Sequence, residues 1–230
     1  MPFLIRLSAL GLITALGACA TTTPTTPAPT TPSGPPPLPS GAIGNVTESG
    51  GDYAIEANST SYDLGTPVIT VNDDYRFNGA FGNATFTYGA VARGYSKADV
   101  DAMGGMLSDG TAFSGVTGTA ATSLPSTGTA TYLGRFSMVY ESATPGVLSA
   151  TSGGMSLTAD FDAMTVVGNP SPAAALSVSG AITGSTFAGT ASCNYSTCSA
   201  TVAMEGGFYG ANGVAGAFAG TGLAGAFYAE

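Results

Sequence analysis

The C-terminal half of the sequence contains a series of short segments in which apolar and polar residues alternate, and a few turn-forming residues follow each segment. The alternation is clearest in Gly128–Glu141, where the apolar residues share one parity: Ala130, Tyr132, Phe136, Met138 and Tyr140. The residues of the other parity are largely polar: Thr129, Thr131, Arg135 and Ser137. Because successive side chains of a β-strand point to opposite faces, a period of two indicates a strand with one buried face.

Similar patterns predict seven further strands: Gly153–Asp160, Ala163–Gly168, Ala175–Ile182, Ser185–Ser192, Ser199–Gly206, Gly213–Ala219 and Leu223–Ala229. Short stretches of Gly, Asn, Pro or Ser separate them, as antiparallel hairpins require. Eight such strands can close into a barrel without exposed edges, and the 34 glycines suit a narrow one. We therefore predict an all-β fold with an eight-stranded antiparallel up-and-down β-barrel over residues 126–230. A two-sheet sandwich is the structural alternative.

Residues 41–125 are less regular, and we predict a smaller β-rich region there. Three segments have the character of strands: Asp52–Ala57, Pro67–Val71 and Ala84–Ala92. The spacing in Ser96–Asp99 is that of a helix capping box, so we expect one short helix that ends at Gly104-Gly105. Gly110–Thr122, rich in Gly, Ala and Thr, gives no clear prediction.

The N-terminus has the pattern of an export signal. Residues 1–18 carry one early base, Arg6, followed by the apolar run Leu7–Leu16, which is too short to span a bilayer as a helix. Leu16-Gly17-Ala18-Cys19 matches the lipobox of bacterial lipoproteins. The match implies cleavage before Cys19 and acylation of that residue with palmitate or similar chains. Stable anchoring to a membrane requires more than one such chain. The alternative is an ordinary secretory signal with an incidental cysteine.

Residues 19–40 are expected to form a lipidated, disordered tether. The segment after the cysteine is TTTPTTPAPTTPSGPPPLPS, which has almost no side chains that could build a core, and its prolines remove backbone donors. Ala20 follows the cysteine instead of the Asp that signals inner-membrane retention, so the outer membrane is favoured. The expected location is the cell surface, with the periplasmic face as the alternative.

Charge and composition argue against several classes of function. From Cys19 onward there are four bases (Arg76, Arg93, Lys97, Arg135) and fourteen acids, so 4 − 14 = −10. This net charge repels a phosphate backbone, so no nucleic-acid partner is expected. The chain has no histidine, which removes Ser-His-Asp and Cys-His catalysis and most zinc sites. We therefore expect no enzyme activity, no catalytic residues, no cofactor and no metal site.

Cys193 and Cys198 are the two cysteines that remain once Cys19 is lipidated. They lie between two predicted strands in the sequence CNYSTC. In an oxidising compartment this spacing predicts a disulfide across the hairpin loop. Catalytic or metal-binding thiols are the alternative, although no other soft ligand accompanies them.

Several further motifs have weaker functional readings. Gly220–Gly225 fits GxGxxG but is expected to be a hairpin turn, because no helix can follow it. Asn72-Asp73-Asp74 and the pair Asp99/Asp101 could offer oxygens to calcium, but solvated turns and a helix surface are the expected readings. Asp160 and Asp162 share one parity and are expected to be outward-facing surface acids. The C-terminal aromatic residues are expected to fill the core, with an aromatic-lined ligand cavity as the alternative: Tyr132, Phe136, Tyr140, Phe161, Phe187, Phe208, Phe218 and Phe227.

Four segments resemble the β-barrel domain of transferrin-binding protein B and its wider family of bacterial surface lipoproteins. The segments are LPSTGTATYLG at 124–134, LTADF at 157–161, ITGSTFAG at 182–189, and GGFYG at 206–210 followed by GAF at 216–218. The resemblance implies an eight-stranded barrel, here in a single lobe, preceded by a smaller handle-like region. Known members bind host proteins such as transferrin, haemoglobin or complement factor H, but the resemblance does not transfer the ligand, and with one short-looped barrel transferrin binding is doubtful.

Together these features predict an outer-membrane surface lipoprotein with a ligand- or protein-binding β-barrel that acts in nutrient or metal-carrier capture or in host interaction. Its ligand is expected to be a protein or a small solute, recognised through loops at one end of the barrel, and the ligand-binding residues are unknown. The alternative is a structural or adaptor lipoprotein of the cell envelope that captures no ligand. The lipid at Cys19 is the expected link to the membrane.

Overall fold

Alternating and fully apolar segments of this chain form β-strands, and all regular structure in the described residues is β. The computed structural model describes residues 42–71, 74–82, 87–144, 147–169, 175–194 and 198–230. The sixteen strands are Ala42–Ser49 (β1), Asp52–Ala57 (β2), Thr60–Gly65 (β3), Ile69–Val71 (β4), Asp74–Gly82 (β5), Thr87–Ser96 (β6), Val100–Leu107 (β7), Ala112–Gly118 (β8), Thr129–Glu141 (β9), Leu148–Asp160 (β10), Thr165–Gly168 (β11), Leu176–Thr183 (β12), Thr186–Cys193 (β13), Thr201–Tyr209 (β14), Gly213–Gly220 (β15) and Leu223–Ala229 (β16).

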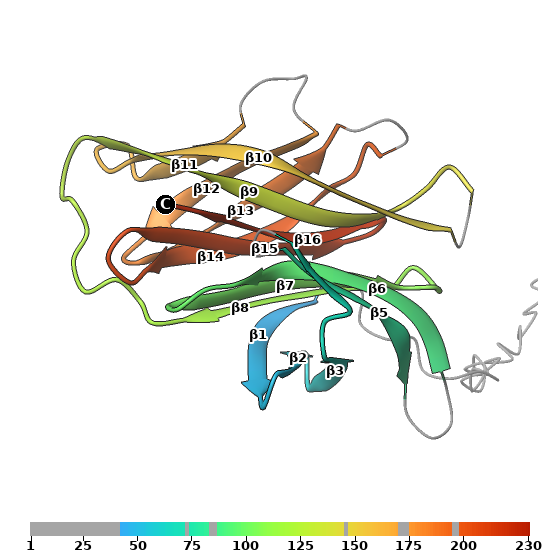
Figure 1. Cartoon of the computed structure of the whole chain (residues 1–230). Helices are drawn as coiled ribbons and strands as arrows, with labels where there is room; N and C mark the ends of the chain where they lie inside the picture. The colour runs from blue at the N-terminus through green and yellow to red at the C-terminus, as the bar shows by residue number, and fades with distance from the viewer. Residues whose placement is uncertain (1–41, 72–73, 83–86, 145–146, 170–174, 195–197) are drawn as a thin grey trace, which may run out of the picture. The chain divides into compact units, whose positions relative to one another are not determined.

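Strands β9 to β16 form a closed barrel in which each strand pairs antiparallel with its neighbours in the chain (Figure 1). Strand β9 closes the barrel by pairing with both β10 and β16. Its Phe136 lies opposite Gly153 of β10 and opposite Phe227 of β16. Each of the eight segments predicted from alternation overlaps one of these strands. The all-β prediction and the eight-stranded up-and-down barrel are therefore confirmed, and the sandwich alternative is wrong.

The barrel is filled by its own side chains. Phe208, which is buried, lies at the meeting point of three aromatic rings, with centroid separations of 5.6 Å to Phe161, 5.8 Å to Phe187 and 6.1 Å to Tyr132. All eight aromatic residues expected in the core belong to this cluster, where Met, Leu and Val side chains join them. An eight-stranded barrel has just enough interior for such side chains, so this one is a packed core.

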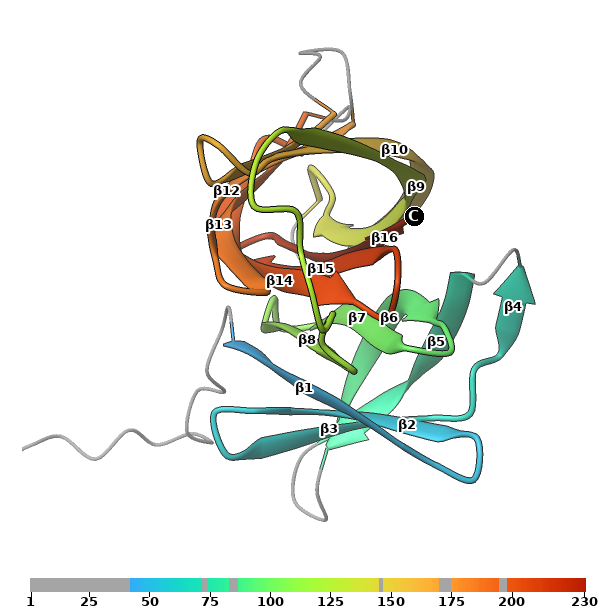
Figure 2. The same ribbon diagram turned by 90° about the vertical axis from the view of Figure 1, so that its left-hand side faces the viewer.

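The N-terminal strands form a second sheet in the order β3-β2-β1-β8-β7-β6-β5-β4. Its neighbouring strands are antiparallel except β1 and β8, which are parallel. The sheet curls so that β2 and β3 lie across from β5 and β6 (Figure 2). The concave face has a core of its own, in which the ring of Tyr62 stacks on Phe113 at 4.2 Å and Tyr53 meets Phe77 edge-on at 5.8 Å.

The short helix expected after Ser96 is absent from the described residues, and that prediction was wrong. Strand β6 continues to Ser96, the amide of Lys97 donates to the carbonyl oxygen of Val100, and β7 begins there. Almost every residue of β7 is buried, so its apolar side chains show no alternation. Such a run cannot be distinguished from a buried helix by periodicity alone. The uninformative stretch Gly110–Thr122 contains a further strand, β8.

The convex face of the sheet packs on the outside of the barrel through small residues. Ala102 of β7 contacts the cluster of Ala215 and Ala226 on β15 and β16, and Met106 contacts Ala219 and Ala224. A Cβ atom added at Gly104 would lie 2.5 Å from the backbone nitrogen of Gly225 on β16. Glycine and alanine at these positions therefore allow two sheets to approach backbone to backbone.

All of these strands belong to one compact unit, Pro37–Glu230. The expected signal peptide at residues 1–18, the lipidation site Cys19 and the tether at residues 19–40 lie outside the described residues. Within the described part of the chain, no helix has the length and apolar character needed to cross a membrane.

Candidate binding surface at the seam between the sheet and the barrel

A buried charged cluster joins the N-terminal sheet to the barrel. Asp74 of β5 has a side chain that is 5% exposed, and its Oδ2 accepts a hydrogen bond of 3.0 Å from Nε of Arg76 and lies 3.8 Å from Nη1 of Arg93. Its Oδ1 accepts a hydrogen bond of 3.0 Å from Oγ of Ser137, which belongs to barrel strand β9. Burial lowers the pKa of Arg93, and the charge of Asp74 opposes this shift. The carboxylate is thus held between two arginines and a hydroxyl from the other sheet.

Tyr95 of β6 lies beside this cluster and is 2% exposed. Burial is the main cause that raises the pKa of its hydroxyl far above the ordinary value, and the charges of Asp74, Arg93 and Arg135 also act on it. The hydroxyl is close to Ser137, whose effect on this pKa is smaller than that of burial. It forms no hydrogen bond of good geometry within the described residues. Tyr95 therefore brings an unsatisfied donor to the place where the sheet meets β9.

Two hollows open along this junction, which we call the seam. The first, of about 170 Å³, is lined by Tyr95, Lys97, Leu133, Gly134, Arg135, Tyr228 and Glu230. The second, of about 260 Å³, shares Lys97, Tyr228 and Glu230 and is bordered by Asp99 and Tyr209. The ammonium group of Lys97 lies 5.1 Å from the centre of the Tyr228 ring, and the Tyr228 hydroxyl donates a hydrogen bond of 2.7 Å to Oε2 of Glu230. The shared residues thus form a ridge between the two hollows.

The seam gathers the positive charge of the chain. All four bases after the N-terminal signal are on β5, β6, β9 or the turn after β6: Arg76, Arg93, Lys97 and Arg135. Three acids, Asp74, Asp99 and Glu230, are their neighbours here, so the local sum is 4 − 3 = +1. Most of the other acids lie on strands or turns that carry no base. Beside the exposed Arg135, Leu133 projects to solvent with 67% of its surface exposed.

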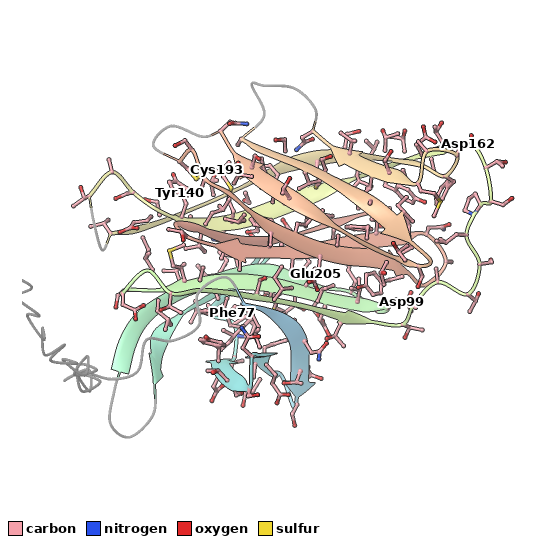
Figure 3. The ribbon with its side chains drawn as sticks, turned by 180° about the vertical axis from the view of Figure 1, so that it is seen from behind. Phe77, Asp99, Tyr140, Asp162, Cys193 and Glu205 are labelled. Atoms are coloured by element: carbon pink, nitrogen blue, oxygen red, sulfur yellow. A yellow bond between two sulfur atoms is a disulfide. The ribbon has the colours of Figure 1, made fainter. Side chains whose placement is uncertain are left out.

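The end of the barrel that carries the disulfide is a second place where a ligand could meet the chain. Cys193 ends β13, and the structure joins it to Cys198 with a Cα–Cα separation of 5.7 Å. Figure 3 shows Cys193 and Tyr140 toward one end of the barrel and Asp162 at the other. A shallow hollow at the disulfide end is lined by Glu141, Ser142, Cys198, Ser199, Ala200 and Gly222. No basic or aromatic residue is among those that line it, whereas such residues distinguish the seam.

The weaker sequence motifs have structural explanations. Gly220–Gly225 spans the turn between β15 and β16, as expected. Oδ1 of Asp160 accepts hydrogen bonds from the amides of Asp162 and Ala163, so it closes a turn, and Oδ2 of Asp162 accepts one from the amide of Gly128. These two acids therefore hold turns and do not form a facing catalytic pair.

The candidate calcium ligands are also dispersed. Asp74 is buried among arginines, while Asn72 and Asp73 lie outside the described residues. Asp99 is in the turn before β7 and Asp101 is within β7, not on the helix surface expected for them. Where the structure describes the chain, no three Cys, Asp or Glu side chains come together as a metal site would require.

Sequence reasoning missed the seam because its residues belong to separate segments. Lys97 was expected in a helix, and Arg135 was noted only as part of the polar face of its strand. The one signal was the presence of all four bases between positions 76 and 135 in an otherwise acidic chain. Their convergence depends on β6 lying against β9, a contact that follows from the tertiary fold.

Comparison with known proteins relates the barrel to one family. The family model described as the C-lobe and N-lobe beta barrels of Tf-binding protein B matches residues 124–230. A solved structure of a mutant of the vaccine antigen Transferrin Binding Protein B from Haemophilus parasuis has a TM-score of 0.47 and 16% sequence identity, and the match covers 80% of this chain and 42% of that one. This chain thus spans less than half the length of that protein. No curated protein matches it. Residues 124–230 are thus similar to the β-barrels of transferrin-binding protein B.

Proposed function

We propose that this chain is a lipid-anchored binding protein of the outer-membrane surface that recognises a protein ligand with the outside of its folded part. The observation that carries the proposal is a barrel similar to those of transferrin-binding protein B, in which the buried side chains of the described strands pack against one another. Among the described residues of the barrel, aromatic, Met, Leu and Val side chains occupy the interior, which favours recognition at the outer surface. We name no host protein, because the family match covers the barrel and not the surfaces that select a ligand.

In this proposal residues 1–18 are the signal peptide and Cys19 carries the lipid. Residues 19–40 hold the folded part away from the membrane, residues 41–125 form the handle-like region, and residues 126–230 form the barrel. A polyproline-like tether of this length would extend roughly 60 Å. This reach suits a protein that presents its surface beyond the lipid headgroups.

The anchor is tested by metabolic labelling with palmitate in a bacterium that expresses the full chain. We expect label on the natural chain and none on Cys19→Ser. Cys193→Ser with Cys198→Ser is the matched control, because it removes two cysteines and leaves the lipobox, and it should label like the natural chain. Equal labelling of Cys19→Ser would contradict the anchor.

Ligand binding is tested with the mature chain carrying Cys19→Ser, which lacks lipid, immobilised and exposed to host serum proteins. A saturable, competable complex with one protein supports capture. The second candidate function, an envelope adaptor, predicts no serum partner and a saturable partner among envelope proteins. The absence of a saturable partner from both sources would contradict both functions.

A further inference from the structure

The charge distribution of the chain singles out the seam as a surface for an anionic partner. Four bases and three acids meet at the seam and give it a local charge of +1, whereas most of the other acids lie on strands or turns that carry no base. An acidic partner is repelled by most of this molecule and attracted to one part of it. Such a distribution orients an encounter and confines binding to that part.

The side chains around the first hollow have the chemistry to hold carboxylates. Arg135 is exposed on β9, and its planar guanidinium can bind a carboxylate through two hydrogen bonds. Lys97 approaches the same hollow from the turn after β6. Tyr95, which also lines the hollow, has a buried hydroxyl without a hydrogen-bond partner in the described part of the molecule.

Apolar groups beside these charges favour a polypeptide over a simple polyanion. Leu133 is 67% exposed and lines the same hollow, and the ring of Tyr228 forms its boundary with the second hollow. An exposed leucine beside an arginine matches a segment in which acidic and apolar side chains are neighbours. A nucleic acid would need many more cations along its backbone than the two at this hollow.

We propose that the seam binds a carboxylate-rich, partly apolar segment of a partner protein, with Arg135 and Lys97 as the charged contacts and Leu133 as the apolar one. This inference rests on the proposed function, from which it takes the assumption that the partner is a protein. It places the contact at the junction of sheet and barrel, away from the disulfide end. Asp99, which borders the second hollow, keeps the acidic segment on the side of Arg135.

The test measures binding of a fluorescein-labelled peptide of alternating Glu and Leu residues to the mature chain with Cys19→Ser, by fluorescence anisotropy at about 50 mM salt. Arg135→Gln, Lys97→Gln and Leu133→Ser should each weaken binding, the first by about fivefold, the size expected for one partly exposed charge pair. Thr190→Glu is the matched control, because it changes net charge by the same −1 as Arg135→Gln on the exposed face of β13. It should leave binding within about 1.5-fold, since distant surface charges are screened.

Three results would overturn the proposal: equal binding of a Lys-Leu peptide, equal weakening by Thr190→Glu and Arg135→Gln, or no saturable binding of the Glu-Leu peptide to a folded chain. Circular dichroism of each variant establishes that it is folded. Arg135-dependent dimers in sedimentation equilibrium without peptide would instead assign the seam to a second copy of this chain. A negative result with the peptide does not alter the interpretation of the serum and palmitate experiments. The seam proposal and the proposed function can therefore be rejected separately.

Discussion

The hydroxyl of Ser137 in the barrel donates a hydrogen bond of 3.0 Å to the carboxylate of Asp74 in the N-terminal sheet, and both side chains are buried. Ser137 belongs to the parity of β9 that the sequence assigns to solvent. It is buried because this half of the strand lies under the curled sheet. One hydrogen bond thus connects the sheet to the barrel at the strand that also carries Arg135.

Ser137→Ala removes this hydroxyl and leaves the buried Oδ1 of Asp74 without its hydrogen-bond donor. We expect the free energy of unfolding to fall by about 1–3 kcal/mol, the usual cost of an unsatisfied buried acceptor. Urea denaturation followed by circular dichroism measures the change. Ser192→Ala, whose hydroxyl meets Thr201 at an exposed position, should cost under about 0.5 kcal/mol. Equal losses for the two variants would contradict the coupling role of Ser137.

Gly104 and Gly154 provide a matched pair of strand glycines. A Cβ at Gly104 would meet the backbone of Gly225 at 2.5 Å, whereas nothing lies within 4 Å of a Cβ at Gly154. Gly104→Ala should therefore lower the free energy of unfolding by about 3 kcal/mol or more, because two backbones must separate. Gly154→Ala should leave it unchanged or raise it by up to about 1 kcal/mol. Denaturation midpoints of the two variants test the close approach of the sheets.

Asp101 predicts a pH dependence of stability. Burial raises its pKa above the ordinary 3.8, with a smaller opposing effect from a hydrogen bond to Ser96 and a smaller raising effect from Glu48. The folded state therefore holds this proton more tightly than the unfolded state. The free energy of unfolding therefore falls as pH rises from 3.8 through the raised pKa of the folded state. Above that pKa the loss of stability is constant.

Asp101→Asn should accordingly raise the melting temperature at pH 7 relative to the natural chain, and the gain should vanish below about pH 3.5, where the carboxyl is protonated in both states. Glu56→Gln on the exposed face of β2 serves as the control and should give no comparable gain at pH 7. Differential scanning calorimetry across this range measures both variants. A gain for Asp101→Asn that is larger at pH 3.5 than at pH 7 would contradict the assignment.

The disulfide predicts a thiol count. With Cys193 and Cys198 bonded, the denatured, non-reduced Cys19→Ser chain should take up no alkylating reagent, and the reduced chain should take up two equivalents by mass spectrometry. Closing so short a loop should contribute roughly 2 kcal/mol in the chain-entropy model. Replacing both cysteines by Ser should therefore lower the melting temperature. Two reactive thiols before reduction would favour the free-thiol alternative.

The barrel could be predicted from the sequence because its strands pair with their neighbours in the chain. Each hairpin is local, and the interior face keeps its alternation in strands such as Leu176–Thr183. The N-terminal sheet was harder, because β1 pairs in parallel with β8, about seventy residues away in the chain. Strand β7 is buried on both faces, so its residues do not alternate, and its two glycines resemble the end of a helix. The sequence therefore predicted a short helix there.

The candidate surface could not be predicted because its residues meet only after the two sheets pack. Arg135 and Leu133 are on a barrel strand, while Tyr95 and Lys97 come from the sheet and its turn. Alternation correctly placed Arg135 on the outer face but could not indicate which outer residues the second sheet would cover. The burial of Ser137 and Val139 on that same strand follows from this contact.

Protease treatment of intact cells that express the full chain tests the central claim most directly, that the folded part is presented outside the membrane as a binding surface. The account predicts that the protease removes residues 41–230 from intact cells by cutting the tether, while a periplasmic control protein survives. Digestion only after the outer membrane is opened would place the folded part inside and contradict the account.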